Sequence, residues 1–390
     1  GWDMQFSGEE SAGLWLGRIW RPGIGPCVVT VRDGEVHDIT SKAAPTTRDI
    51  MEMEDPAGHV RAATGERIGS VSDIRGQADA GDGPYWLAPC DLQAVKACGV
   101  GPGDEVITPA AGFPTTVNPI PQVGCTPVFV DVDPETFNLD PAAAAAAVTP
   151  RTRAIVVINP NNPTGAVYPE PVLARIAEIA ERHHMVVFSD EIYDQMTYED
   201  VRHVPMAGLV RDTLCATFSG LSKVYRACGY RVGWTVFTGN KENAETYLDA
   251  LELLAALRLC SNVPGQWAVQ TALGGFQSIR GLVEPGGKLF ESRQAIIDAS
   301  RASEFIELIP PAGAMYAFPR VRTDDLPGFD DYQFAMDLLE HKHVLVAPGV
   351  SFNVPYRDHF RVTTLPDPVV IGEAMERIED LLHSYRVSEI

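Results

Sequence analysis

The chain has 390 residues, about two to three times the length of a typical single domain, so we expect at least two domains. Apolar residues make up 45% and charged residues 21% of the sequence, proportions that are typical of folded globular proteins and exclude the fibrous and disordered classes. The formal net charge of −21 disfavours binding to nucleic acid or to an anionic membrane surface, and we expect neither as a partner.

The first hundred residues are rich in short β-like runs. Residues 27–32 and 35–39 are two such runs, and the Asp33-Gly34 dipeptide between them is typical of a hairpin turn. Residues 65–84 are rich in Gly and Asp and predict a loop or linker. We therefore expect a β-rich N-terminal segment over residues 1–86, and its degree of order stays open.

Five β-rich runs follow, and the intervals of 18 to 26 residues between them are typical of βαβ units. They cover residues 105–108, 127–130, 154–158, 185–189 and 214–218. All five are far shorter than the roughly 20 apolar residues that a membrane-spanning helix needs. This spacing predicts a mostly parallel sheet, which requires helices on both of its faces.

Helices of the required kind are predicted between these strands. In residues 169–183, one face carries Leu173, Ile176, Ala177 and Ala180. Asp140 followed by Pro141 is a typical start for a helix over residues 142–147. The fold class is therefore α/β, with a large domain over residues 87–275.

The last third of the chain has a different pattern. Residues 241–259 and 290–300 predict two further helices, and residues 313–318 and 344–348 belong to a mixed α and β segment. We expect a smaller C-terminal α+β domain over residues 276–390.

Cysteine and histidine usage gives two further expectations. The seven cysteines include no CxxC pair and are odd in number, which favours reduced thiols and a cytoplasmic location. Residues 1–10 also lack the pattern of a secretory leader. The pairs His183/His184 and His341/His343 have no accompanying ligand cluster, so no metal site is expected.

Polar residues follow three of the predicted strands at the point where each strand ends. Asn162 lies in the NPNNPTG segment 159–165, Asp190 and Tyr193 follow residues 185–189, and Lys223 follows residues 214–218. Ligands of open parallel sheets bind outside the carboxyl ends of the strands, where these side chains could converge. Taken alone, each has a simpler explanation: a turn, a helix cap, a packed aromatic ring or a solvated charge.

Together these residue types suit pyridoxal phosphate. That cofactor needs a lysine amine for its aldehyde, an acid for its pyridine nitrogen, and donors for its phenolate oxygen. Arg231 adds a guanidinium suited to bidentate binding of a phosphate.

Residues 151–390 resemble class I pyridoxal-phosphate aminotransferases of fold type I, and most closely the alanine (glutamate–pyruvate) aminotransferases. The motifs that carry the resemblance lie at residues 159–165, 189–193, 219–233, 259–264, 313–319 and 360–362. The resemblance implies catalytic roles for Lys223, Asp190 and Tyr193, and substrate binding by Arg361, through the α-carboxylate, and by Asn162. The implied cofactor contacts are Lys223, Asp190, Asn162, Tyr193, Ser219, Ser222 and Arg231.

Phe113 is a further candidate for the cofactor site, because its ring could stack on the pyridine; packing in the core is the alternative. The resemblance also implies that the enzyme is a homodimer. Its substrates would be a small amino acid such as alanine and a 2-oxo acid such as pyruvate or 2-oxoglutarate.

The remaining segments resemble other families, which makes the chain a mosaic. Residues 99–150 resemble DegT-type sugar aminotransferases and dehydratases, and residues 14–98 resemble the N-terminal part of fumarylacetoacetate-hydrolase-like dehydratases. Pro89, Cys90 and Asp91 stand where fold type I families have a Gly/Ser/Thr turn for the cofactor phosphate, and Pro89 lacks an amide donor. Two alternatives therefore stay open: a catalytically impaired or non-enzymatic chimera, and a DegT-like sugar enzyme.

Overall fold

The computed structural model describes residues 17–22, 24–44, 50, 53, 55–70, 85–87, 100–242, 244–245, 247–249, 251–252 and 263–387. The chain divides into two compact units, residues 1–93 and residues 94–390. Pro89, Cys90 and Asp91, and residues 259–262 of one of the motifs, lie outside the described residues. None of the described helices combines the length and apolar character needed to cross a lipid bilayer.

The described part of the first unit contains an antiparallel sheet. Its strand order is β4-β3-β2-β1-β5, from the strands β1 (Gly17–Arg21), β2 (Gly25–Arg32), β3 (Glu35–Asp38), β4 (Glu66–Ser70) and β5 (Tyr85–Leu87). The predicted hairpin is confirmed, since Asp33 and Gly34 join β2 to β3 with φ angles of 52° and 78°. A short helix, α2 (Pro56–Ala62), precedes β4.

The expectation of a loop over residues 65–84 was wrong for its first part. Residues 66–70 form β4, which pairs with β3, and the partly buried Ile68 packs against the cluster around Val36. The Gly and Asp content of the segment concealed this strand, because its pairing depends on β3 rather than on local sequence. The later part of the predicted loop lies outside the described residues.

The second unit is built on a mostly parallel sheet, as predicted. Within the described residues its strand order is β11-β10-β9-β8-β6-β7, from β6 (Glu105–Pro109), β7 (Thr126–Val130), β8 (Thr152–Ile158), β9 (Val186–Asp190), β10 (Leu214–Gly220) and β11 (Gly233–Gly239). Only β11 runs antiparallel to its neighbour, β10. This edge strand had not been predicted from the sequence.

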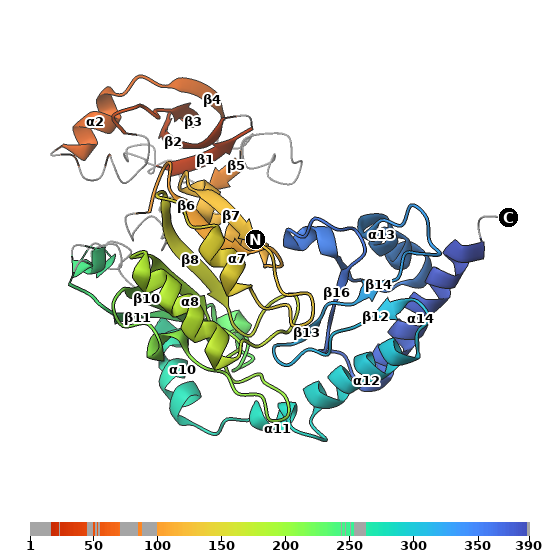
Figure 1. Cartoon of the computed structure of the whole chain (residues 1–390). Coiled ribbons are helices and arrows are strands. Elements are labelled where there is room, and N and C mark those ends of the chain that lie inside the picture. Colours follow the sequence, from red (N-terminus) through yellow and green to blue (C-terminus); the bar gives the residue numbers. More distant parts are fainter. Residues whose placement is uncertain are drawn as a thin grey trace. The chain divides into compact units, whose positions relative to one another are not determined.

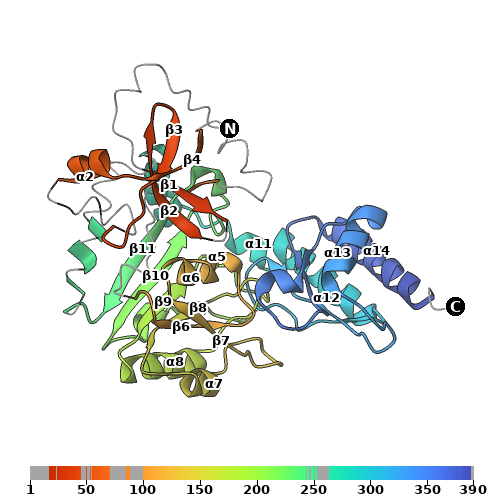
Figure 2. The same ribbon diagram turned by 90° about the horizontal axis from the view of Figure 1, so that it is seen from above.

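Helices cover both faces of this sheet, which confirms the α/β prediction (Figure 2). One face carries α5 (Pro114–Val117) and α6 (Pro119–Gln122), and the other carries α7 (Pro141–Ala146) and α8 (Glu170–Arg182). Asp140 accepts a hydrogen bond from the Ala142 amide and caps α7, as its position before Pro141 had indicated.

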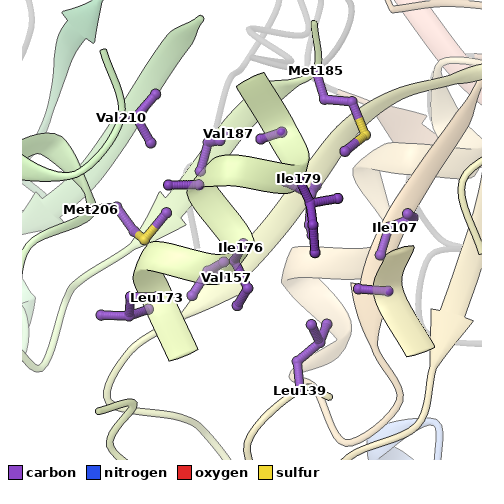
Figure 3. Packing of buried hydrophobic residues seen from close by; sticks show 14 of the residues in the cluster. Ile107, Leu139, Val157, Leu173, Ile176, Ile179, Met185, Val187, Met206 and Val210 are labelled. Carbon is purple, nitrogen blue, oxygen red and sulfur yellow. The ribbon is translucent and has the colours of Figure 1, made fainter. Parts of the chain in front are cut away.

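The periods of helix and strand place apolar side chains of α8 and of the sheet on the sides that face each other, and these side chains form the core between them. Leu173, Ile176 and Ile179 of α8 pack against Val157 of β8 and Val187 of β9 (Figure 3). Alternate residues of β8 point to the opposite face, so β8 is buried on both sides and is apolar almost throughout.

The C-terminal part is a smaller α+β arrangement. Helices α12 (Lys288–Ala302) and α14 (Pro368–Val387) lie side by side in Figures 1 and 2 and share a buried cluster with α13 (Asp331–Lys342). The short strands of the described residues form two small sheets, β12-β14 and β13-β16-β15. The remaining elements are α10 (Val263–Gly274), α11 (Arg280–Val283), β12 (Ile306–Glu307), β13 (Tyr316–Ala317), β14 (Arg320–Val321), β15 (Ala347–Pro348), β16 (Phe360–Thr363), and the 3-10 helices η2 (Met206–Gly208), η3 (Cys228–Tyr230) and η4 (Gly349–Phe352).

The described residues include one of the two predicted helices of this region in full and the other in part. Residues 290–300 lie within α12. Of residues 241–259, only part is described, and Glu245, residues 247–249 and residues 251–252 are helical. The boundary between a large and a small domain near residue 275 stays a prediction.

Candidate active site

Three neighbouring strands end at the predicted site. Asp190 is the last residue of β9, and in the sheet it pairs with Ile158, the last residue of β8, and with Phe218 of β10. The segment carrying Asn162 follows β8, and the turn carrying Lys223 follows β10. The parallel pairing therefore brings these segments to one edge of the sheet.

Asp190 is a partly buried carboxyl group next to the charge of Lys223. Its Oδ1 accepts a hydrogen bond of 3.3 Å from the Ile192 amide. Burial raises the pKa of Asp190, and the hydrogen bond from Ile192 and the positive charge of Lys223 oppose that shift. A cationic or N–H group that reached this carboxylate would be bound more strongly than at the surface, because water competes with it less there.

Arg361 and Asn162 meet although 199 residues separate them in sequence. Nη1 of Arg361, on β16, donates a hydrogen bond of 2.9 Å to Oδ1 of the buried Asn162. The guanidinium carbon lies 4.5 Å from the centre of the Tyr316 ring and 4.9 Å from that of Phe352. Two aromatic rings and one amide thus hold the guanidinium in place.

The guanidinium keeps unused donor capacity. Its Nε is buried and has no hydrogen-bond partner among the described residues. Burial lowers the pKa of Arg361, while Tyr316 and Tyr193 shift it in the opposite direction. A partly buried cation with a free N–H group is suited to binding a carboxylate.

Tyr193 contacts Tyr316, the residue whose ring packs against Arg361. Its hydroxyl lies 3.0 Å from the hydroxyl of Tyr316, and the two rings pack edge to face at 5.7 Å between centroids. Burial and the neighbouring Tyr316 raise the pKa of Tyr193, Asp190 adds to the rise, and the charge of Arg361 opposes it. Direct contacts therefore link Asn162, Arg361, Tyr316 and Tyr193, and Asp190 acts on Tyr193 through its charge. We call these five residues the connected group.

Sequence reasoning assigned no role to Tyr316, which lies at the centre of this group. It is part of the motif at residues 313–319, and that motif was the available signal. Tyr193 and Tyr316 are 123 residues apart, so their contact follows only from the packing of the C-terminal part on the sheet.

The loop that carries Lys223 is closed by two facing glycines. Gly220 of β10 and Gly233 of β11 are direct partners in the antiparallel pair. A Cβ on Gly220 would lie 2.8 Å from the Val232 carbonyl oxygen, and one on Gly233 would lie 3.0 Å from that of Ser219. At the next pair of residues in the loop, the Leu221 amide donates a hydrogen bond of 3.0 Å to the Val232 carbonyl. We call this feature the glycine neck.

The residues expected to bind phosphate lie next to the glycine neck or in the loop that it closes. Ser219 directly precedes Gly220, and Ser222 and Arg231 are in the loop. Ser219 and Ser222 are partly buried, whereas Arg231 is exposed. Arg231 has a left-handed backbone with φ of 51°, and its Nη1 donates a hydrogen bond of 2.7 Å to the Cys228 carbonyl. Their role in binding phosphate stays a prediction.

Phe113 takes part in the aromatic packing beside Arg361. Its ring lies 6.4 Å from that of Phe352, the ring in contact with the Arg361 guanidinium. It belongs to the cluster that includes Ala111 and Phe318. The contacts in the structure agree with core packing, and stacking on a cofactor stays a prediction.

Comparison with known proteins adds independent information. The model of the family "Aminotransferase class I and II" matches residues 91–378, a range that includes residues 99–150. The chain is 42% identical over 307 residues to an alanine aminotransferase of Mycobacterium tuberculosis, covering 78% of this chain and 71% of that protein. It is 41% identical over 297 residues to the glutamate-pyruvate aminotransferase AlaA of Escherichia coli, with coverage of 75% and 73%.

Solved structures agree with this result. An aminotransferase from Escherichia coli superposes with a TM-score of 0.73 at 41% identity, covering 75% of this chain and 73% of that one. An alanine aminotransferase from Pyrococcus furiosus superposes with a TM-score of 0.70 at 35% identity, with coverage of 75% and 74%. From the family match, these relatives and the parallel-sheet site, we conclude that the chain belongs to the class I and II aminotransferases, enzymes of fold type I.

Proposed function

We propose that the protein uses pyridoxal phosphate to transfer an amino group between a small amino acid such as alanine and a 2-oxo acid such as pyruvate or 2-oxoglutarate. The observation that carries the proposal is the connected group beside the turn of Lys223. It combines a partly buried acid, an amine and a partly buried guanidinium with a free donor.

The residues present fit this cofactor. When bound, pyridoxal phosphate supplies an aldehyde that reacts with amines and a ring that takes up electrons. Asp190 would hold the proton of the ring nitrogen, because its partly buried carboxyl group accepts only from the Ile192 amide among the described residues and can still accept from an N–H group. Asn162 and Tyr193 would contact the phenolate oxygen, and Ser219, Ser222 and Arg231 the phosphate.

Two further residues would act on the substrate. Lys223 would provide the amine for the cofactor aldehyde and the base that moves a proton at the substrate Cα. Arg361 would bind the α-carboxylate through its free Nε, and Asn162 would keep the guanidinium aligned. The named activities of the relatives support alanine and glutamate as amino donors.

The competing proposal is a chain whose N-terminal segment has disabled catalysis, and one experiment separates the two. Pyridoxal phosphate is added to the purified protein, the visible absorption is recorded, and L-alanine is then added. Binding followed by a spectral change with alanine supports the enzyme, binding alone supports the impaired chimera, and no binding contradicts both the cofactor and the function.

The position of the reactive lysine has its own test. Reduction of the loaded protein with borohydride, followed by peptide mapping, is expected to find the pyridoxyl group on Lys223. Lys241 is a suitable internal control because it also follows a strand of this sheet, β11. An adduct on any residue other than Lys223 would contradict the assignment.

We also propose that the protein is a homodimer in the cytoplasm. Apolar side chains in and just after α10 are exposed: Trp267 by 77%, Leu273 by 53% and Phe276 by 94%. Several large exposed apolar side chains within one short segment are typical of protein interfaces. Trp267→Glu is expected to shift the protein towards monomer in sedimentation velocity, whereas Leu345→Glu, at a site that is 78% exposed in another part of the chain, is the matched control.

A further inference from the structure

A second acid lies directly beside the site; it is buried, and the proposed function does not use it. Glu191 follows Asp190, and its side chain is only 6% exposed. Its Oε1 accepts hydrogen bonds of 2.8 Å from the Ser189 hydroxyl and 3.0 Å from the Met206 amide. Its Oε2 lies 3.5 Å from Nε2 of His203, whose side chain is 8% exposed.

The histidine reaches the neighbouring strand end as well. Its ring forms a hydrogen bond with the backbone of Asn159, where only a ring N–H can donate to the carbonyl. The remaining nitrogen, Nε2, is buried, has no hydrogen-bond partner among the described residues and faces Glu191. One shared proton between Oε2 and Nε2 would satisfy both atoms.

This pair spans the two strand ends that carry the site. Asn159 opens the segment that leads to Asn162, and its amide also donates a hydrogen bond of 2.9 Å to the Asp190 carbonyl. Glu191 is adjacent to Asp190 in the chain. Contacts of Glu191 and His203 therefore join the end of β9 to the end of β8.

The charge of the pair follows from its surroundings. Asp190 and Asp194 are the charged groups that act on Glu191, and both disfavour its ionised form. Burial raises the pKa of Glu191 and lowers the pKa of His203 to about 4. With one shared proton the pair has no net charge wherever that proton lies.

We propose that Glu191 and His203 are positioning residues that share one proton, fix the ends of β8 and β9 against each other, and keep a second net negative charge away from Asp190. The part of this inference that concerns the cofactor rests on the proposed function. The part that concerns the strand ends does not.

Three variants and one control test the proposal. His203→Leu and Glu191→Ala each remove the contact between the two side chains. Glu191→Gln keeps Oε1 as an acceptor for Ser189 and Met206, and its side-chain amide can donate an N–H to Nε2 of His203. Thr213→Val is the matched control: the Thr213 hydroxyl donates a buried hydrogen bond of 2.7 Å to Met185, and these residues precede β10 and β9 at the opposite end of the same sheet.

Two readouts are needed. In the cofactor-free protein, hydrogen exchange measured by mass spectrometry should become faster in peptides covering residues 159–165 for His203→Leu and Glu191→Ala, and stay unchanged for Glu191→Gln and Thr213→Val. In the loaded protein, the first two variants should weaken pyridoxal phosphate binding by about tenfold, as expected for a buried polar group left without its partner. They should also shift the pH at which the visible absorption changes, while Glu191→Gln and Thr213→Val leave both properties near wild type.

The outcomes are distinct. If His203→Leu merely lowers the melting temperature, as Thr213→Val does, the role is only structural and the proposal is wrong. If Glu191→Gln is as damaging as Glu191→Ala, the pair needs an ionised carboxylate and proton sharing is wrong. If wild type binds no cofactor, the proposed function fails, and the exchange data alone still decide whether the pair holds the strand ends.

Discussion

Replacing Arg361 with lysine keeps the positive charge but removes the planar group that fits between Tyr316 and Phe352. The guanidinium makes one hydrogen bond to Asn162, at 2.9 Å, and contacts the two rings at 4.5 and 4.9 Å. A lysine ammonium is a compact charge on a flexible chain, so it cannot both reach Asn162 and present a second N–H group at the position of Nε.

The size of the effect follows from the lost donor. A hydrogen bond to a charged group contributes about 1.5–3 kcal/mol, and about 1.4 kcal/mol corresponds to a factor of ten. Loss of one such bond to the substrate carboxylate should raise KM for alanine by about 10- to 150-fold. Because Lys223 and Asp190 are unchanged, kcat should fall much less than KM rises.

Steady-state kinetics with alanine and 2-oxoglutarate measure both constants. Arg320→Lys is the matched control, since Arg320 is half exposed and its Nε pairs with Asp358 at 2.8 Å, outside the connected group. The melting temperature of each variant checks the fold. A KM for Arg361→Lys within twofold of wild type, or an equal change in Arg320→Lys, would refute the assignment of Arg361 as the carboxylate anchor.

Two other predictions concern stability and the acid. Burial raises the pKa of Asp190, so the stability that this group contributes is complete below the ordinary pKa of aspartate and is lost as pH rises through the raised value. Asp190→Asn should therefore raise the melting temperature of the cofactor-free protein at pH 7 to 8 while largely abolishing transamination; a lower melting temperature at that pH would contradict the burial argument. Leu173→Ala should lower the free energy of unfolding by about 2–5 kcal/mol in a denaturant titration, because Leu173 is fully buried, and the exposed Glu170→Ala should change it little. If Leu173→Ala lowers the free energy of unfolding by less than about 1 kcal/mol, the surrounding core must collapse into the space that the smaller side chain leaves.

Much of the sheet could be predicted because its strands depend on local sequence. Strands β6 to β10 are apolar runs at βαβ spacing, and α8 shows its buried face in the positions of Leu173, Ile176, Ala177 and Ala180. The convergence of Asp190 with the turns carrying Asn162 and Lys223 followed from the rule that parallel strands end at one edge.

The rest depends on contacts that local sequence does not contain. Strand β11 forms because β10 offers it an unpaired edge, and β4 forms because β3 does the same. Tyr316 and His203 join the site through packing between distant segments, so their residue types alone gave no signal.

The glycine neck has a consequence for how this enzyme can vary. Because Gly220 and Gly233 pair directly in the sheet, they fix the distance between the two ends of residues 221–232. The sheet therefore sets the two attachment points of this loop, the residues at which it begins and ends. Residues 228–230 near the tip are exposed, so we expect that their side chains can be exchanged without moving those attachment points. A methyl group at Gly220 would press on the Val232 carbonyl and open the hairpin, and the lysine would then move relative to the acid at the end of β9. Variation at the tip of the loop is therefore tolerated only while Gly220 and Gly233 are kept.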